Sequence, residues 1–162
     1  MRLLKIIFLI ATLSIFYMSY KTNINYNGTV GVLKTSKSVI KVEARDTIDH
    51  LIKALIHVES RGIDDAVNKS SNAVGCMQIR PIMVKDVNRI LSKSDSEKRY
   101  TLRDRYSRAK SIEMFNVWRC YYHNKSSLEK ISRCWNGGTK GHLRSYTLRY
   151  WTKVKEFYES NK

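Results

Sequence analysis

The sequence has little of the residues that mark several classes of protein. It holds a single proline and seven glycines in 162 residues, which excludes collagen-like chains and chains disordered by richness in these two residues. Acidic residues are also few, at 14 against 30 lysines and arginines, so the formal net charge is +16. A hydrophobic fraction of 43% is too high for a wholly disordered chain, and the length allows one ordinary domain. The charge suggests a polyanionic partner, either nucleic acid, a lipid surface or an acidic cell-wall polymer.

Cysteine and histidine are too scattered to predict a metal site. Of the three cysteines, Cys76, Cys120 and Cys134, at least one must stay free or pair with another chain, and no Cys/His spacing resembles a zinc site. Cys120 and Cys134 lie on either side of a polar stretch at 123–127, where two helices could fold back on each other. A disulfide between these two and buried free thiols stay as alternatives. We expect no metal and no cofactor.

Long apolar runs are absent except at the start of the chain. Arg2 and Lys5 precede an uncharged run over Ile6–Tyr20, which is the pattern of an export signal. No A-x-A cleavage site follows, and the run is short for a membrane span. Residues 1–20 are therefore either a cleaved signal peptide or a retained anchor. In the second case, residues 3–20 would attach the protein to the membrane. Both alternatives take the chain to the periplasm or cell envelope, so we expect no nucleic-acid partner, and no docking motif for one is recognisable.

Apolar residues at helical spacing predict a mostly α-helical domain over residues 46–162. Residues 21–45 are polar and lack this spacing, so we expect a flexible linker there, with room for a short strand at 39–42. The charged stretch 93–107 predicts a surface insertion or an unusual cleft rim. We expect the protein to be a monomer. The expected helices begin at Asp46, at Pro81, near Ser107 and at a capping box of Ser126 with Glu129, and the last carries Leu143 to Phe157.

Glu59 falls where the apolar stripe of the first expected helix predicts another apolar residue. The stripe passes through positions 48, 51/52 and 55/56 and reaches 59 next. A carboxyl group that faces a core is poorly solvated, which raises its pKa. A carboxylic acid that keeps its proton near neutral pH is what general-acid catalysis requires. Taken alone, the position also fits a glutamate at a fraying helix end that turns to solvent.

Four short motifs occur in an order that is typical of one family of glycan-cleaving domains. They are Glu59-Ser60, Gly75-Cys76-Met77-Gln78, Trp135-Asn136-Gly137-Gly138 and Thr147-x-x-Tyr150-Trp151-x-x-Val154. Together, over about residues 46–158, they resemble the soluble-lytic-transglycosylase-like (SLT) domain of the lysozyme superfamily. The resemblance implies a lysozyme-like (goose-type/SLT) helical fold that follows the N-terminal signal or anchor segment. It also implies the glycan strands of peptidoglycan as the substrate.

The resemblance further implies a role for individual residues. Glu59 is implied as the single catalytic acid/base, and Gly75 as a point where the backbone approaches a glycan closely. Tyr150 is implied to hydrogen-bond the catalytic glutamate. The remaining implied substrate-binding residues are Ser60, Met77, Gln78, Trp135 and Asn136. Cys76 and Cys134-Trp135 depart from the family's Leu and Ala-Tyr, although Trp135 keeps an aromatic ring that could stack on a sugar.

The implied reaction is cleavage of the β-1,4 bond between N-acetylmuramic acid and N-acetylglucosamine, with formation of a 1,6-anhydro-muramic product. Hydrolysis of the same bond is an alternative, because goose-type lysozymes share the fold. A glycosidase normally uses a second carboxylate, for which Asp64 and Asp65 are the nearest candidates in the sequence. A further alternative is a non-catalytic glycan-binding or structural component of an apparatus that spans the cell wall. The producer could be a bacterium or a phage.

Overall fold

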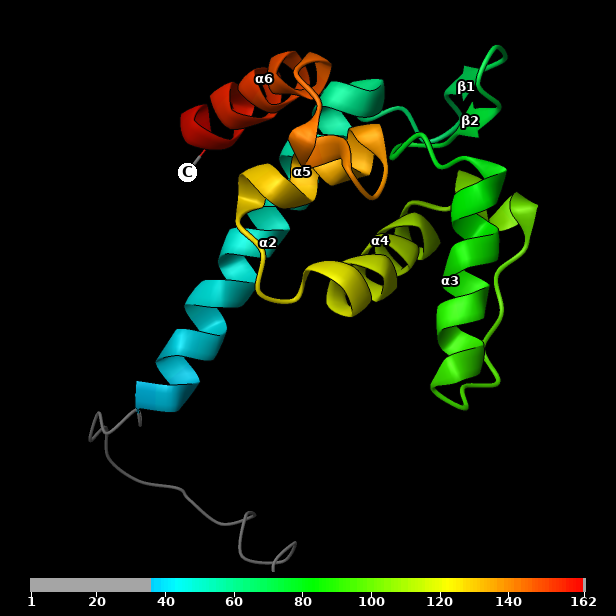
Figure 1. The fold of residues 1–162 in the computed structure, drawn as a ribbon, viewed down its shortest axis with the longest axis horizontal. Coiled ribbons are helices and arrows are strands. Elements are labelled where there is room, and N and C mark those ends of the chain that lie inside the picture. Colours follow the sequence, from blue (N-terminus) through cyan, green and yellow to red (C-terminus); the bar gives the residue numbers. More distant parts are fainter. Residues whose placement is uncertain (1–35, 162) are drawn as a thin grey trace, which may run out of the picture. The chain divides into compact units, whose positions relative to one another are not determined.

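The computed structural model describes residues 36–161, with side chains from residue 47 onwards. The predicted signal or anchor segment and residues 21–35 of the expected linker lie outside this range. The elements in order are α2 (Ser36–Ser60), β1 (Val67–Asn68), β2 (Ala73–Val74), α3 (Pro81–Lys93), the 3-10 helix η1 (Leu102–Tyr106), α4 (Arg108–His123), α5 (Leu128–Gly137), the 3-10 helix η2 (Gly141–Leu143) and α6 (Tyr146–Ser160). The prediction of a mostly helical fold is confirmed (Figure 1).

The core forms around the second half of α2. Its predicted stripe is buried at Leu51, Ile52, Leu55 and Ile56, and each fully buried side chain of this kind contributes about 1.5–3 kcal/mol. One hydrophobic cluster joins this stripe to every later α-helix, through residues that include Val87, Phe115, Ile131 and Val154. Helix α3 contacts α4, and α5 contacts α6. Within the described range, no helix is both long enough and apolar enough to cross a membrane.

Helix α2 begins well before the predicted start at Asp46. It begins at Ser36, so the expectation of a linker over 36–45 with a strand at 39–42 is wrong. The segment contains β-branched residues, Val39, Ile40 and Val42, which favour a strand. It contains no proline or glycine, however, so nothing interrupts the helix that the buried half stabilises.

The other helix starts agree with the sequence to different degrees. Pro81 is the first residue of α3, and Ser107 caps α4 by accepting a hydrogen bond from the backbone N–H of Lys110, as predicted. Helix α5 is capped by Ser127, which accepts from the N–H of Lys130 at 3.3 Å, so the capping box at Ser126 is wrong. The last helix begins at Tyr146, after Leu143, which lies in η2 and is 71% exposed.

A short hairpin and a buried arginine hold the loop that leads into α3. Strands β1 and β2 are antiparallel, with Val67 opposite Val74. This small sheet was not predicted, because no alternating pattern marks these two-residue strands. Arg105 in η1 is only 6% exposed, and its guanidinium donates to the carbonyls of Asn72 at 2.8 Å and Ile79 at 3.1 Å. The stretch 93–107 is therefore not simply a surface insertion, because Arg105 supports the hairpin from below the surface.

Candidate active site

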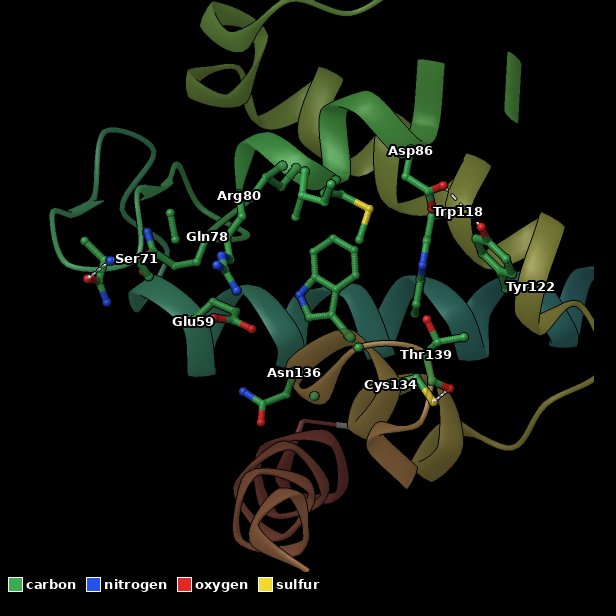
Figure 2. Close-up of a pocket in the computed structure, with 18 of the residues that line it drawn as sticks. Glu59, Ser71, Gln78, Arg80, Asp86, Trp118, Tyr122, Cys134, Asn136 and Thr139 are labelled. Carbon is green, nitrogen blue, oxygen red and sulfur yellow. Dashed lines mark hydrogen bonds between the residues drawn. The ribbon is translucent and has the colours of Figure 1, made fainter. Parts of the chain in front are cut away.

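A cleft of about 770 Å³ passes the C-terminal end of α2 (Figure 2). We call its two sides the α2–α3 wall and the α4–α6 wall. Polar and charged residues of the α2–α3 wall include Glu59, Asn68, Gln78, Arg80 and Asp86. The α4–α6 wall includes Trp118, Trp135, Asn136, Arg144 and Tyr146. The lining residues thus come from all five described α-helices as well as from the hairpin.

Glu59 lies in the last turn of α2, where the buried stripe meets the cleft. The side chain is partly buried, and the hydroxyl of Tyr150 on α6 donates to its Oε1 at 2.8 Å. Burial raises the pKa of Glu59 from 4.5 to about 7, while hydrogen bonds from Tyr150 and Trp135 lower it by less. Desolvation outweighs the hydrogen bonds because both partners are uncharged and neither supplies a full positive charge. Glu59 is therefore divided between its acid and its carboxylate form near neutral pH.

Tyr150 keeps its proton and remains a hydrogen-bond donor. Burial, followed by the nearby charge and hydrogen bond of Glu59, raises the pKa of Tyr150 well above 10. The hydroxyl fixes Oε1 of Glu59 in position. The role that the resemblance implied for Tyr150 agrees with this geometry, although Tyr150 itself does not line the cleft.

Trp135 is held in place by neighbouring aromatic rings. Its ring centroid lies 5.1 Å from that of Phe115 and 5.2 Å from that of Trp118, both in edge-to-face arrangements. Such pairs contribute about 0.5–1.5 kcal/mol each beyond the area that they bury. The packing fixes the indole beside Glu59, where it can also present part of its surface to the cleft.

Gln78 and Asn136 line the cleft, as the resemblance implied. Gln78 has a positive φ of 47°, and its amide nitrogen donates to the carbonyls of Ala66 at 3.2 Å and Gly75 at 3.0 Å. Both amide protons are thereby used, so only the amide oxygen is available to a ligand. Asn136 is exposed near the end of α5.

Ser60, Gly75 and Met77 do not line the cleft, so the substrate contact implied for them does not fit their positions. The Ser60 hydroxyl donates to the carbonyl of Cys76 at 2.9 Å, and Met77 is fully buried in the core. Gly75 has φ +82°, and a Cβ there would lie 1.9 Å from the backbone oxygen of Arg105. The close approach that needs a glycine is therefore to another part of the chain. All three residues hold the loop that positions Gln78.

The second carboxylate in the cleft is Asp86, which was not predicted from the sequence. Asp64 and Asp65 do not line the cleft, and Asp64 is 49% exposed and paired with Arg108 at 3.0 Å. Asp86 on α3 accepts from Arg89 at 2.7 Å and from the hydroxyl of Tyr122 at 3.2 Å. Its only signal in the sequence is its place on α3 three positions after Met83, another lining residue.

The three cysteines are free thiols, so the alternative of a Cys120–Cys134 disulfide does not apply. Cys120 is exposed, whereas Cys134 is buried with its sulfur 3.3 Å from Nδ1 of His142. Among the residues that the structure describes, no group of three His, Cys, Asp or Glu side chains could hold a metal ion.

Comparison with known proteins identifies a family for the part of the chain that carries Glu59. Residues 37–114 match the sequence model of the family described as Transglycosylase SLT domain. The match covers all of α2 except its first residue, the hairpin, α3, η1 and the start of α4, and therefore the whole α2–α3 wall of the cleft. No protein with a curated description matches the chain.

Proposed function

We propose that this chain, which carries an SLT domain of the lysozyme-like superfamily, cleaves the glycan strands of peptidoglycan as a lytic transglycosylase. The family supports a glycan-cleaving activity of the transglycosylase type. The specific reaction rests on Glu59, a cleft carboxyl whose pKa is raised to about 7. We assign the bond between N-acetylmuramic acid and N-acetylglucosamine as the one that is cleaved.

Glu59 acts first as an acid and then as a base. In its protonated form it donates the proton to the glycosidic oxygen, the bond from that oxygen to the muramic C1 breaks, and positive charge develops at C1. The resulting carboxylate then removes the proton of the muramic 6-hydroxyl, whose oxygen bonds to C1. The products are a free N-acetylglucosamine hydroxyl and a 1,6-anhydro-muramic end, and Glu59 is protonated again. A pKa near the working pH suits a group that must both give and take a proton.

The surroundings of Glu59 support this role. Tyr150 and Trp135 orient the carboxyl group without neutralising it by a charge, and no ion pair among the described residues includes it. Gln78 and Asn136 lie in the same cleft, where the amide oxygen of Gln78 and the amide group of Asn136 are suited to hydrogen-bond the acetamido and hydroxyl groups of the sugars.

Hydrolysis of the same bond is the second candidate, because Asp86 also lines the cleft. A hydrolase would use this carboxylate to activate a water molecule or as a nucleophile. Its ion pair with Arg89 and its hydrogen bond from Tyr122 favour the transglycosylase, since both interactions must weaken before Asp86 can act as a base.

The products decide between the two candidates. The full chain is incubated with purified peptidoglycan, and the released fragments are identified by mass spectrometry. We expect 1,6-anhydro-muramic ends, which lack one water relative to hydrolysed ends. Reducing muramic ends without the anhydro form would show a hydrolase. Binding of the glycan without any released fragment would instead support the non-catalytic module.

We also propose that the protein acts outside the cytoplasm, because its substrate lies there and residues 1–20 have the pattern of an export signal. Fractionation of cells that produce the full chain tests this: the protein should appear in the periplasm or envelope. Comparison of its mass with that of the full sequence then tells a cleaved signal from a retained anchor.

A further inference from the structure

The positive and negative charges of the residues that line the cleft do not balance. Four of them line it: Glu59, Arg80, Asp86 and Arg144. Asp86 is already paired with Arg89, and Glu59 is uncharged for part of the time near neutral pH because its pKa is about 7. None of the ion pairs among the described residues includes Arg80 or Arg144. The cleft therefore presents two guanidinium groups that form no ion pair with any described residue.

Arg80 reaches into the cleft from the start of α3. It has an extended backbone, with φ −86° and ψ 154°, and Pro81 directly after it restricts that backbone to such a conformation. Its side chain is exposed and does not cap the helix that it precedes. Figure 2 shows the guanidinium on the same side of the cleft as Gln78, directed toward Glu59. Its planar set of donors is thus free to bind a ligand in the cleft that Glu59 also lines.

Arg144 presents a second guanidinium from the α4–α6 wall. It follows η2, and its Nη1 donates to the hydroxyl of Tyr146 at 3.0 Å. The guanidinium carbon lies 5.9 Å from the centre of the same ring. Tyr146 therefore orients the guanidinium without neutralising it, and donors remain for a second partner.

Carboxylate is the ligand group that matches these arginines. The guanidinium fork binds a planar carboxylate through two parallel hydrogen bonds, and alternate sugars of a peptidoglycan strand carry carboxylates on their muramic substituents. We propose that Arg80, assisted by Arg144, binds a carboxylate of the muramic unit, so that the cleft selects anionic strands over neutral strands of the same sugars. This inference rests on the proposed function and deepens it.

The carboxylate could come from two sources with the same chemistry. In an intact strand it belongs to the stem peptide, because the lactyl group of the muramic acid is bound in an amide. In a strand from which an amidase has removed the peptides, it belongs to the lactyl group itself. Because Arg80 points toward Glu59, we expect the lactyl position or the first residues of the stem to be the part that it contacts.

Binding measurements test the inference without relying on catalysis. The Glu59→Gln variant is titrated with a soluble muramic tetrasaccharide that carries its stem peptides, and with the same compound after its carboxylates are converted to amides. We expect the anionic compound to bind about tenfold more tightly. Adding Arg80→Gln to this background should remove most of that preference, and Arg80→Lys should restore part of it. The peptide-free tetrasaccharide then shows which source of carboxylate is bound.

Arg103→Gln is the matched control. Arg103 is exposed and lies outside the cleft lining, and its substitution removes the same charge as Arg80→Gln. It should leave the preference unchanged. Equal affinity of the Glu59→Gln protein for the anionic and amidated compounds would overturn the inference, as would an Arg103 effect as large as that of Arg80. Neither result would contradict the proposed function. The proposed function is contradicted if the wild-type protein releases no fragments from peptidoglycan.

Discussion

The two ends of the cleft hold the same chemical group in opposite surroundings. At one end the Glu59 carboxyl is held by Tyr150 and Trp135, which are neutral donors. At the other end Asp86 meets the guanidinium of Arg89 at 2.7 Å. Neutral donors orient a carboxyl group but leave desolvation as the larger effect, whereas a cation balances its charge. The identity of the partners, more than the shared cleft, therefore separates an acid suited to proton transfer from a carboxylate held in an ion pair.

The largest expected difference between the two ends is in the catalytic rate. Glu59→Gln should lower kcat by about a thousandfold or more, because the amide keeps the shape of the side chain but cannot deliver a proton. Asp86→Asn should change kcat by less than about threefold. Release of soluble fragments from peptidoglycan measures both. If Asp86→Asn lowered kcat as much as Glu59→Gln, the two carboxyl groups would not differ in role, and the result would favour the hydrolase.

The next effect is on stability, and it depends on pH. Because the pKa of Glu59 in the folded protein, about 7, lies above its ordinary 4.5, the folded state binds this proton more tightly than the unfolded state. The stabilisation that this proton gives the folded state is complete below pH 4.5 and is lost as the pH rises through 7. The free energy of unfolding of the wild type should thus fall by up to about 3 kcal/mol relative to Glu59→Gln over this range.

Denaturant unfolding of both proteins between pH 4 and pH 8 measures this difference. The Asp86→Asn variant serves as the control. Its free energy of unfolding should fall with rising pH as that of the wild type does, because Glu59 is still present. A constant difference between wild type and Glu59→Gln at every pH would mean that Glu59 is not buried strongly enough to perturb its titration.

A smaller effect is expected from removing one hydroxyl at each end. Tyr150→Phe removes a hydrogen bond that lowers the pKa of Glu59, so the pKa should rise and the alkaline limb of the pH–rate profile should move to higher pH. We also expect kcat to fall about tenfold, because the carboxyl group is no longer held in position. Tyr122→Phe removes the matching hydroxyl from Asp86 and should leave the alkaline limb in place. A shift of the limb in Tyr122→Phe would show that the two ends are coupled.

The sequence predicted the Glu59 end of the cleft better than the Asp86 end. Glu59 interrupts a regular apolar stripe, and a helix carries such a pattern locally, so burial of the carboxyl group follows from spacing alone. Asp86 carries no comparable signal, since it becomes a cleft residue only when α3 packs beside α4. Proximity in sequence pointed instead to Asp64, which the fold turns away toward Arg108.

The motifs predicted which residues matter more reliably than what they contact. Gly75 occupies a position where only glycine fits, but the neighbour that requires it is the carbonyl of Arg105. Ser60 likewise bonds to the backbone of Cys76. Both partners are set by tertiary packing, which a short motif does not encode. The early start of α2 was missed for a related reason, because the weak propensity of residues 36–45 is overridden by the helix that continues from the core.

Arg105 has a practical consequence for anyone who wishes to shorten this domain. The charged stretch around it would be the natural segment to trim, since most of its side chains are exposed. Its buried guanidinium, however, holds two carbonyls that flank the Gly75–Gln78 loop, and its own carbonyl closes against Gly75. A deletion that includes residue 105 would release both contacts together and allow Gln78 to move. Shortened versions of the domain should therefore be cut within residues 94–99 and keep η1 whole.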